Sequence, residues 1–361
     1  MGKFLSKLRN LEGAVKPEDG EAALLNCLKT PSPSVNWTFA APGAGIPFGT
    51  GTLLYGPPKS GKSVFISSIV GQLHQDDPEA IVVKFDTELR GTFQNNSHNL
   101  AKFGIDQDRY IMYDANSPEM IFDRIEHDIA AACQDGEKIK MIVIDSLSGI
   151  AGRRSLNATS VNTQQIGDQA ATIKDGLARI LPVIRKYKIA LVCTAHIRAE
   201  MDIKEQMRGN TVKMQASFAT KHVFEYFCSI EPNRSKDGKV NLAGEEFVDK
   251  DIVDFMDKSQ KTGHKIRFKV VDSSFAYSGR TAEFTLDYAN GIVNQYEEIF
   301  TLSVNMGIIE RPNNVTYKYG ENTYRGIVAM LTAIRDNEGL YKELETKIIE
   351  HDFNYLRSPK K

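Results

Sequence analysis

The chain has 361 residues, enough for one large α/β domain with small additions, and its 41% of hydrophobic residues suffice for a buried core. A formal net charge of −1 excludes a protein that binds nucleic acid through a basic surface as a whole, so any such contact must use local basic clusters. Four cysteines without zinc-type spacing, and the lack of a signal-peptide core or a membrane-length apolar run, predict a cytoplasmic protein with reduced thiols and no membrane partner.

Residues 1–34 differ from the chain that follows them. Apolar residues recur at helical spacing between Phe4 and Leu11, and the turn-rich stretch 30–35 reads as a connector. An apolar face with so little chain behind it needs a surface on which to dock. We therefore predict that residues 1–34 are a helical oligomerisation segment and a linker.

Gly56 to Ser63 follows an apolar strand-like run and reads Gly-Pro-Pro-Lys-Ser-Gly-Lys-Ser, which fits the phosphate-loop pattern G-x-x-x-x-G-K-[ST]. In such a loop the glycines let backbone N–H groups surround the phosphates, Lys62 reaches the β- and γ-phosphates, and Ser63 offers its hydroxyl to Mg²⁺. The predicted nucleotide-binding residues are Gly56, Pro57, Pro58, Lys59, Ser60, Gly61, Lys62, Ser63 and Val64.

After this loop, strand and helix patterns alternate, which predicts an α/β fold with a parallel sheet covered on both faces. The expected strands are 80–85, 110–114, 140–145 and 189–194, and the expected helices are 63–75, 119–133 and 169–187. Beyond residue 221 the pattern predicts an antiparallel or mixed extension of the sheet, with strands at 223–230, 265–272 and 282–288. Residues 295–361 form a predicted small C-terminal domain, with helices at 295–305 and 324–349 and a hairpin within 307–320.

Polar residues end three of the predicted strands. Asp145 follows an apolar run, and a carboxylate at that edge can hold the Mg²⁺ shell through water, so together with the loop it implies ATP or GTP. Asp86 and Glu88 end another strand, and Glu88 is the candidate base that orients the attacking water; the alternative is a solvated pair of acids. His196 ends a third strand, where it either contacts the γ-phosphate or only caps the strand.

The order of several motifs resembles the RecA family of recombinases, and most of all its phage UvsX-like branch. They are Gly-Ala-Gly-Ile-Pro-Phe-Gly, the phosphate loop, Phe-Asp-Thr-Glu, Val-Ile-Asp-Ser, Thr-Ala-His-Ile-Arg and Asp-Lys-Ser-Gln-Lys, between about Val35 and Asn290. The resemblance implies a RecA-like ATPase core over 35–294 that uses ATP and Mg²⁺. It also implies that Glu88 is the catalytic glutamate, Asp145 the Walker B acid and His196 the γ-phosphate switch.

The same resemblance assigns two long polar stretches to DNA binding. Residues 151–165, with Arg153 and Arg154, match the first DNA-binding loop, and 197–220 match the second; the second contains Arg198, Lys204, Arg208 and Lys213. Such long polar loops are unusual inside a compact domain unless they are functional or disordered. Their basic side chains would contact phosphates; the alternative is a surface loop with ordinary charges.

Two places depart from the family pattern. The aromatic residue that stacks on adenine is not evident, and Phe93 is the substitute that we predict. Two lysines that would act on the nucleotide of the next subunit are Lys258 and Lys261, although Gln260 stands where the family has the second cation.

These patterns predict an ATP-dependent recombination protein that forms a helical filament on single-stranded DNA and exchanges strands with a duplex. Its expected partners are single- and double-stranded DNA, further copies of itself, a single-strand-binding protein and a loading mediator, in a bacterial or phage-infected cytoplasm. Two alternatives stay open: a hexameric helicase or RadA-like remodeller with the same core, and a nucleotide-sensing assembly protein that does not touch DNA.

Overall fold

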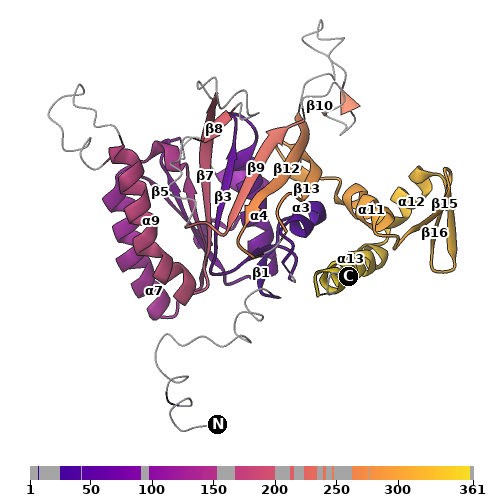
Figure 1. Cartoon of the computed structure of the whole chain (residues 1–361), viewed down its shortest axis with the longest axis horizontal. Coiled ribbons are helices and arrows are strands. Elements are labelled where there is room, and N and C mark those ends of the chain that lie inside the picture. Colours follow the sequence, from indigo (N-terminus) through magenta and orange to yellow (C-terminus); the bar gives the residue numbers. More distant parts are fainter. Residues whose placement is uncertain are drawn as a thin grey trace, which may run out of the picture.

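The computed structural model describes residues 25–41, 43–90, 97–152, 167–199, 223–233, 262–275 and 277–357, together with Lys7 and the short stretches 212–214, 239–240 and 246–247. The described chain has an α/β fold in which a large, mostly parallel sheet is covered by helices, and a small antiparallel sheet follows towards the C-terminus (Figure 1). The predicted fold class is confirmed.

The central sheet combines a parallel part with an antiparallel extension. Six neighbouring strands run parallel in the order β5 (Tyr110–Asp114), β4 (Ile81–Asp86), β6 (Ile139–Asp145), β7 (Ala190–Ala199), β3 (Gly51–Gly56) and β9 (Tyr226–Pro232). Antiparallel pairing then adds β12 (Gly263–Ser273), β13 (Thr281–Asp287) and β14 (Gly291–Val293) beyond β9. The short strands β10 (Lys239–Val240) and β11 (Glu246–Phe247) extend β12, and β8 (Val212–Met214) pairs with β7.

Both faces of the inner parallel strands β3, β4, β6 and the first part of β7 are buried, which explains why those strands are almost continuously apolar, whereas β5 at the edge is partly exposed. Val82 packs with Phe65 of α4 (Lys62–Asp76) on one face, and Val83 packs with Ile180 of α9 (Asp168–Lys186) on the other. The second face also carries the helical run η2 (Glu119–Asp123), η3 (Ile125–Ile129) and α7 (Ala130–Gln134). The remaining short elements of the core are β1 (Cys27–Leu28), β2 (Ile46–Pro47), α6 (Ser97–Lys102), η1 (Gln107–Arg109) and η4 (Leu147–Gly149).

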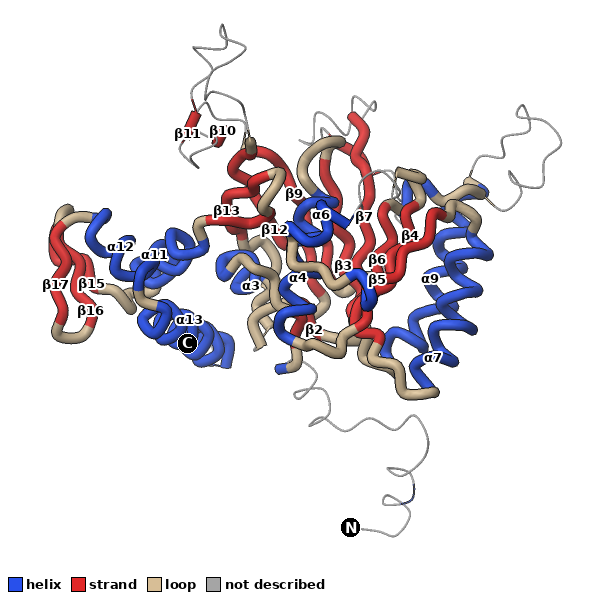
Figure 2. The backbone as a smooth tube through the Cα atoms, turned by 180° about the vertical axis from the view of Figure 1, so that it is seen from behind, coloured by secondary structure: helices blue, strands red, loops and turns tan. Residues whose placement is uncertain are grey.

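The C-terminal unit has its own core beside the sheet (Figure 2). Its elements are α11 (Gln295–Asn305), β15 (Glu310–Asn313), β16 (Thr316–Tyr319), β17 (Asn322–Arg325), α12 (Ile327–Asp336) and α13 (Glu338–Arg357). The single helix predicted over 324–349 was wrong: residues 322–325 form a third strand, and the helix is broken at Asn337. Tyr324 pairs across the strands with Tyr317, and the Asn337 side chain accepts a hydrogen bond from Leu340 N, so it starts a new helix.

A short helix, α3 (Pro33–Thr38), begins inside the stretch that the sequence predicted as a connector. Ser32 caps it by accepting a hydrogen bond from Val35 N, and Pro33 occupies its first turn, where a missing N–H costs nothing. This helix packs between β13 and the C-terminal helices α11 and α13. Within the described residues, no helix is both long and apolar enough to cross a bilayer.

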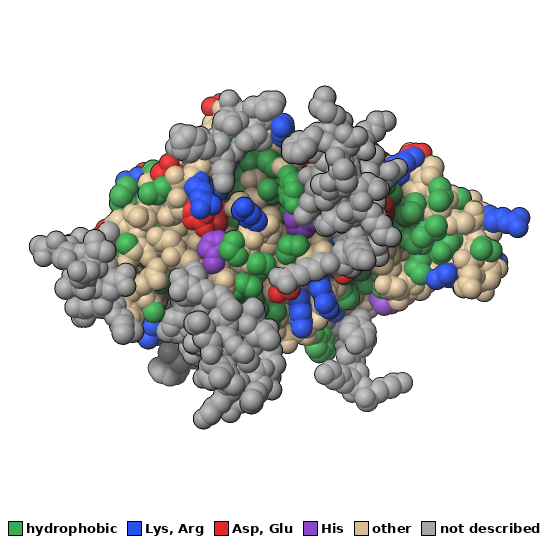
Figure 3. Space-filling model, turned by 90° about the horizontal axis from the view of Figure 1, so that it is seen from above, with side chains coloured by type: hydrophobic (Ala, Val, Ile, Leu, Met, Phe, Trp, Pro, Cys, Tyr) green, Lys and Arg blue, Asp and Glu red, His purple; other side chains and the backbone are tan. Residues whose placement is uncertain are grey.

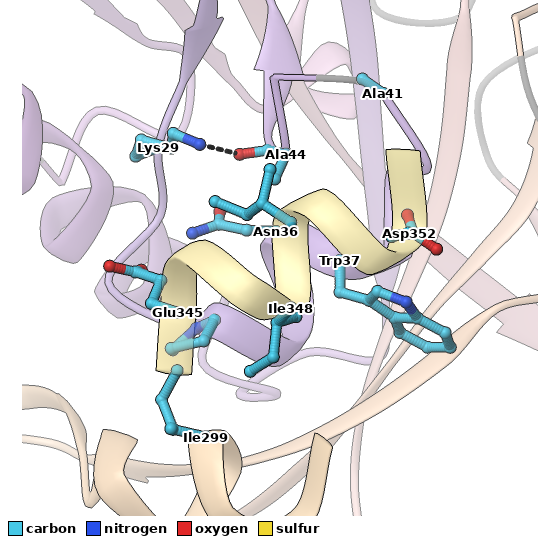
Figure 4. Close-up of a pocket in the computed structure, with 11 residues that line it drawn as sticks. Lys29, Asn36, Trp37, Ala41, Ala44, Ile299, Glu345, Ile348 and Asp352 are labelled. Atoms are coloured by element: carbon cyan, nitrogen blue, oxygen red, sulfur yellow. Dashed lines mark hydrogen bonds between the residues drawn. The ribbon is translucent and has the colours of Figure 1, made fainter. Parts of the chain in front are cut away.

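Two ionisable side chains, Arg280 and Glu298, connect α3 to the C-terminal unit in different ways. Arg280 lies over the Trp37 ring at 4.5 Å, donates to Trp37 O at 2.9 Å and pairs with Asp352 of α13 at 2.8 Å. Figure 4 shows the small pocket beside this contact, where Trp37 of α3 faces Ile348 and Asp352 of α13. The C-terminal unit is thus attached through a helix that belongs to the N-terminal part of the chain.

Glu298 of α11 is the second of these side chains. It is 6% exposed, and its Oε2 accepts hydrogen bonds from the Ser32 hydroxyl and from Ser34 N at 3.1 Å. Burial raises the pKa of Glu298 to about 8, and the Glu297 charge adds to that rise although the serine hydrogen bonds oppose it. Near neutral pH the group therefore binds a proton in the folded chain.

We predict that stability falls with rising pH because of Glu298. The pKa of this carboxyl group is raised from its ordinary value of 4.5 to about 8 by folding, so the group stabilises the folded state fully below pH 4.5. That stabilisation is lost as the pH rises from there through about 8. The slope that this group adds reaches about 1.4 kcal/mol per pH unit inside that window. Urea unfolding from pH 5.5 to 9 should show a loss that Glu298→Gln, which stays neutral, does not show; equal pH profiles for the two proteins would refute the assignment.

Candidate functional site

The carboxyl ends of the parallel strands bring the predicted site residues to one edge of the sheet. Gly56 pairs in register with His196, and Asp86 with Asp145. Figure 3 looks onto this edge, where acidic, basic and histidine side chains gather around a hollow. A cavity of about 1010 Å³ opens there; its lining comprises Pro58, Lys59, Ser60, Gly61, Lys62, Ser63, Val64, Asp86, Glu88, Arg90, Asp145, His196, Ile197 and Tyr288.

The loop between β3 and α4 has the glycines that its surroundings demand. A Cβ on Gly56 would lie 2.1 Å from the carbonyl oxygen of Ile230 on β9, so no larger residue fits there. Gly61 has a φ of +88° and directly precedes α4, whose first N–H groups are not used within the helix. The loop and the helix start therefore form an anion-binding arrangement.

Lys62 is buried at the start of α4, and its ammonium group bends back over the loop. Its Nζ donates to Gly56 O at 3.1 Å and to Pro57 O at 2.9 Å. Burial lowers the pKa of Lys62, while the charges of Asp145 and Glu88 oppose that shift. The ammonium thus lies where phosphate oxygens at the loop can compete for it.

Asp145 is the polar centre of the site. One carboxylate oxygen, Oδ2, accepts from Ser63 Oγ at 3.0 Å and lies 3.4 Å from Lys84 Nζ, and the other, Oδ1, accepts from Thr194 Oγ1 at 2.6 Å. Burial by itself would raise the pKa of Asp145, but the Lys84 charge and the three hydrogen bonds outweigh it and lower that pKa. Burial likewise opposes the charge on Lys84, yet Asp145 keeps the pKa of Lys84 raised, so both groups are ionised.

The oxygen donors at this point suit Mg²⁺, a hard cation that binds one or two carboxylates and substrate phosphates. Ser63 Oγ and the Asp145 carboxylate lie side by side at the cavity. The hydroxyl of Ser60 is buried in the loop and has no hydrogen-bond partner within the described chain, so a polar donor is also available there. The residues present therefore fit a Mg²⁺–nucleotide ligand.

Glu88 and His196 meet directly across the cavity. Glu88 Oε1 lies 2.5 Å from His196 Nε2, and Glu88 Oε2 lies 3.2 Å from Arg90 Nη1. The backbone fixes both partners, because Glu88 N donates to Asp86 Oδ1 at 3.0 Å and His196 N donates to Ser148 Oγ at 3.1 Å. A carboxylate and an imidazole so arranged can orient a water molecule and respond to a ligand near it.

Sequence reasoning missed several residues of this site. Lys84 stands among apolar residues in the middle of β4, which was a visible signal because lysine is rarely buried without a partner. Thr194 looked like any strand residue. Tyr288 follows β13 and reaches the cavity, where its hydroxyl lies 2.6 Å from His264 Nδ1; the strand order alone brings it there.

Other predicted residues lie outside the described part of the chain. They are Phe93, Arg153, Arg154, Lys204, Arg208, Lys258 and Lys261. Arg198 and Lys213 lie on described backbone, but their side chains do not belong to the described set. Within the predicted second DNA-binding loop, 197–220, strand β7 continues to Ala199 and pairs antiparallel with β8, so that Arg198 lies opposite Lys213. The DNA-binding role of this stretch stays a prediction.

Comparison with known proteins agrees with this geometry. Residues 13–293 match the family model of the RecA N-terminal domain. The chain belongs to the RecA family. It is 23% identical over 327 residues to Protein RecA of Oleidesulfovibrio alaskensis, covering 90% of this chain and 83% of that protein. It is 22% identical over 357 residues to Protein RecA of Thermus aquaticus, covering 96% and 95% of the two chains.

A further relative, Protein RecA of Nitratidesulfovibrio vulgaris, is 24% identical over 331 residues, which cover 92% of this chain and 83% of that protein. The RecA match spans both the parallel strands and the antiparallel extension up to β14. This RecA-family chain is therefore a protein of the RecA recombination and repair type.

Thr87 holds the turn after Asp145 in this RecA core. Its buried hydroxyl donates to Ser146 O at 2.6 Å and accepts from Ser146 N at 2.8 Å, and Gly149 packs directly against it. These bonds join the ends of β4 and β6, which carry Glu88 and Asp145. The Thr87 hydroxyl thus adds to the backbone bond from Thr87 N to Asp145 O, 3.0 Å long, in holding the two acids in place relative to each other.

We predict that Thr87→Val lowers the free energy of unfolding by about 1–3 kcal/mol, because Ser146 N and O lose a buried partner. Urea denaturation should show this loss, and Thr87→Ser should recover most of it. Thr52 offers a matched control: it is equally buried in the sheet, but its hydroxyl has no partner within the described chain, so Thr52→Val should be neutral or stabilising. Equal effects of the two valine variants would contradict the role of Thr87.

Proposed function

We propose that the protein is an ATP-dependent recombinase that forms a helical filament on single-stranded DNA and catalyses homologous pairing and strand exchange with a duplex. The observation that carries the proposal is the gathering of Lys62, Ser63, Asp145, Glu88 and His196 around one cavity in a RecA-family chain. Each stands at the start of α4 or near the point where the parallel pairing of a strand ends, which is where α/β sheets bind ligands.

In the proposed reaction the chain hydrolyses ATP to ADP and phosphate. The loop N–H groups and Lys62 bind the phosphates, and Ser63 and Asp145 hold Mg²⁺, which would neutralise charge on the phosphoryl group. Glu88 orients the attacking water, and His196, already in contact with Glu88, senses the γ-phosphate. Among the described residues that line the cavity, Tyr288 is the aromatic side chain that we propose for contact with the base, and Phe93 stays a second candidate.

Glu88→Gln tests the enzymatic part. The amide keeps the shape but cannot act as a base, so ATP should bind with similar affinity while DNA-stimulated turnover drops by about two to four orders of magnitude. Glu79→Gln is the matched control, because Glu79 is exposed at the opposite end of β4. Loss of ATP affinity with normal turnover at saturation would make Glu88 a binding residue instead.

The DNA part of the proposal concerns the polar stretches that leave the same edge of the sheet. The proposed loops are about 151–165, which begins after η4 beyond the end of β6, and about 197–220, which begins at Ile197 in the lining of the nucleotide cavity. Arg153, Arg154, Arg198, Lys204, Arg208 and Lys213 are the proposed phosphate contacts. Nucleotide bound at that edge would order these stretches, and its hydrolysis would release them.

Removing two of these charges should flatten the salt dependence of single-strand binding. Each phosphate contact releases about 0.7 of a counterion, so Arg208→Ala/Lys213→Ala should reduce the log–log salt slope by about 1.4. Fluorescence anisotropy with a labelled oligonucleotide at several salt concentrations measures it. Lys342 and Lys347 lie exposed on α13, so the control Lys342→Ala/Lys347→Ala should leave the salt slope unchanged. If Arg208→Ala/Lys213→Ala also left it unchanged, the DNA would bind elsewhere.

Assembly completes the proposal. We propose that Lys258 and Lys261 act on the nucleotide of a neighbouring protomer, that residues 1–34 mediate oligomerisation, and that 35–294 and 295–361 are the core and the small C-terminal domain. His196 at the γ-phosphate position favours the phage UvsX-like branch. A single-strand-binding protein and a loading mediator are the further partners that we propose.

Electron microscopy with an ATP analogue and single-stranded DNA distinguishes the rival functions. A helical filament supports the recombinase, whereas closed rings that unwind a forked duplex would indicate a helicase or remodeller. Hydrolysis that single-stranded DNA does not stimulate would indicate a nucleotide-sensing assembly protein.

A further inference from the structure

Lys84 is an unusual residue for the interior of a parallel sheet. Its side chain is 3% exposed, and its register partners on the neighbouring strands are the apolar residues Met112 and Val143. Removing an ammonium group from water costs several kcal/mol unless a partner of opposite charge compensates it. A lysine at this position therefore requires a local reason.

The partner of Lys84 is the carboxylate that also contacts the phosphate-loop serine. Lys84 Nζ approaches the same oxygen of Asp145 that accepts the Ser63 hydrogen bond. Thr194 holds the other oxygen, so the carboxylate is held from three sides by β4, β7 and the start of α4. No step of the proposed reaction uses Lys84, although it touches the group that would hold the metal.

The side chains that line the cavity include several acids whose charge a nearby lysine can offset. Asp86, Glu88 and Asp145 line the space that would receive a polyphosphate, and they repel it. Lys59 and Lys62 of the phosphate loop also line this space, and Arg90 beside Glu88 is largely exposed and so weakly effective, but none of these three described cations pairs directly with Asp145. Lys84 lies beneath Asp145 in a dry environment, where a unit charge acts more strongly than at the surface.

We propose that Lys84 is a positioning residue that acts as a resident cation for Asp145. It holds the carboxylate beside Ser63 and screens its negative charge from the phosphates, so that the chain retains nucleotide affinity when Mg²⁺ is absent. The inference rests on the proposed nucleotide site and adds to it a residue whose effect depends on the metal. Replacing Lys84 should therefore change the ratio of the ATP dissociation constant in EDTA to that in Mg²⁺. Replacing a purely structural residue would leave this ratio unchanged.

The test measures ATP binding to the full chain by calorimetry, once with Mg²⁺ and once with EDTA. Lys84→Met keeps the length of the side chain and removes the charge. Its dissociation constant in EDTA should rise about tenfold, as expected for the loss of a unit charge several Å from the phosphates. In Mg²⁺ the rise should stay below about threefold, because the metal ion supplies the screening itself.

Lys140→Met is the matched control, since Lys140 lies on the adjacent strand β6 at the end away from the cavity. It should leave both dissociation constants unchanged. The inference would be overturned if Lys84→Met weakened ATP binding by the same factor with and without Mg²⁺, or if it did not weaken ATP binding in EDTA. Absence of Mg²⁺–ATP binding by the wild-type chain would instead refute the proposed nucleotide site.

A second variant covers the case in which Lys84→Met folds poorly. Removing one member of a buried ion pair leaves the other charge buried without a partner, which destabilises the folded state, whereas replacing both members changes the stability little. Lys84→Met/Asp145→Asn should therefore melt at a higher temperature than Lys84→Met alone. A double variant no more stable than the single variant would show that the two groups do not depend on each other, and would overturn the inference as well.

Discussion

The buried carboxylate of Asp145 is the interaction on which the arrangement of the site depends. A desolvated charge costs several kcal/mol unless it is paired and hydrogen-bonded, and here donors come from three elements: Ser63 at the start of α4, Thr194 on β7 and Lys84 on β4. Each element is held in relation to the others because each satisfies part of the same group. The loop serine is thereby placed beside a carboxylate before any ligand arrives.

Close packing from the antiparallel part of the sheet adds a second constraint. The backbone carbonyl of Ile230 on β9 lies where a Cβ of Gly56 would be, whereas Gly61 has a φ of +88° and faces a side-chain methyl of Leu286 on β13. The loop therefore follows a path that only glycine allows at these points. Since Tyr288 enters the cavity directly after β13, the antiparallel extension shapes the site as much as the parallel strands do.

Two ionisable contacts attach the C-terminal unit to the core, one of them an ion pair and the other a protonated carboxyl group. Arg280 and Asp352 form an ion pair beside Trp37, whereas Glu298 is buried in a position that favours its neutral form. Both contacts use α3, which lies between β13 and the C-terminal helices. The N-terminal part of the core thus carries the C-terminal unit, which no local sequence pattern indicates.

Local patterns were sufficient for the phosphate loop, the alternating strands and helices, and the acids at the strand ends, because spacing and burial periodicity are properties of neighbouring residues. That Asp86 and Asp145 share an edge follows from parallel topology and was also predictable. The contacts of Lys84, Thr87 and Tyr288 were not, since their partners lie far away in the chain and only strand order brings them together. The missed segments have different reasons. Strand β17 depends on its hairpin pairing with β16, in which Tyr324 opposes Tyr317, and the helical spacing of its neighbours hid this local signal. Helix α3 has a local cap in Ser32, but its docking against α11 is a long-range contact that the tertiary structure alone supplies.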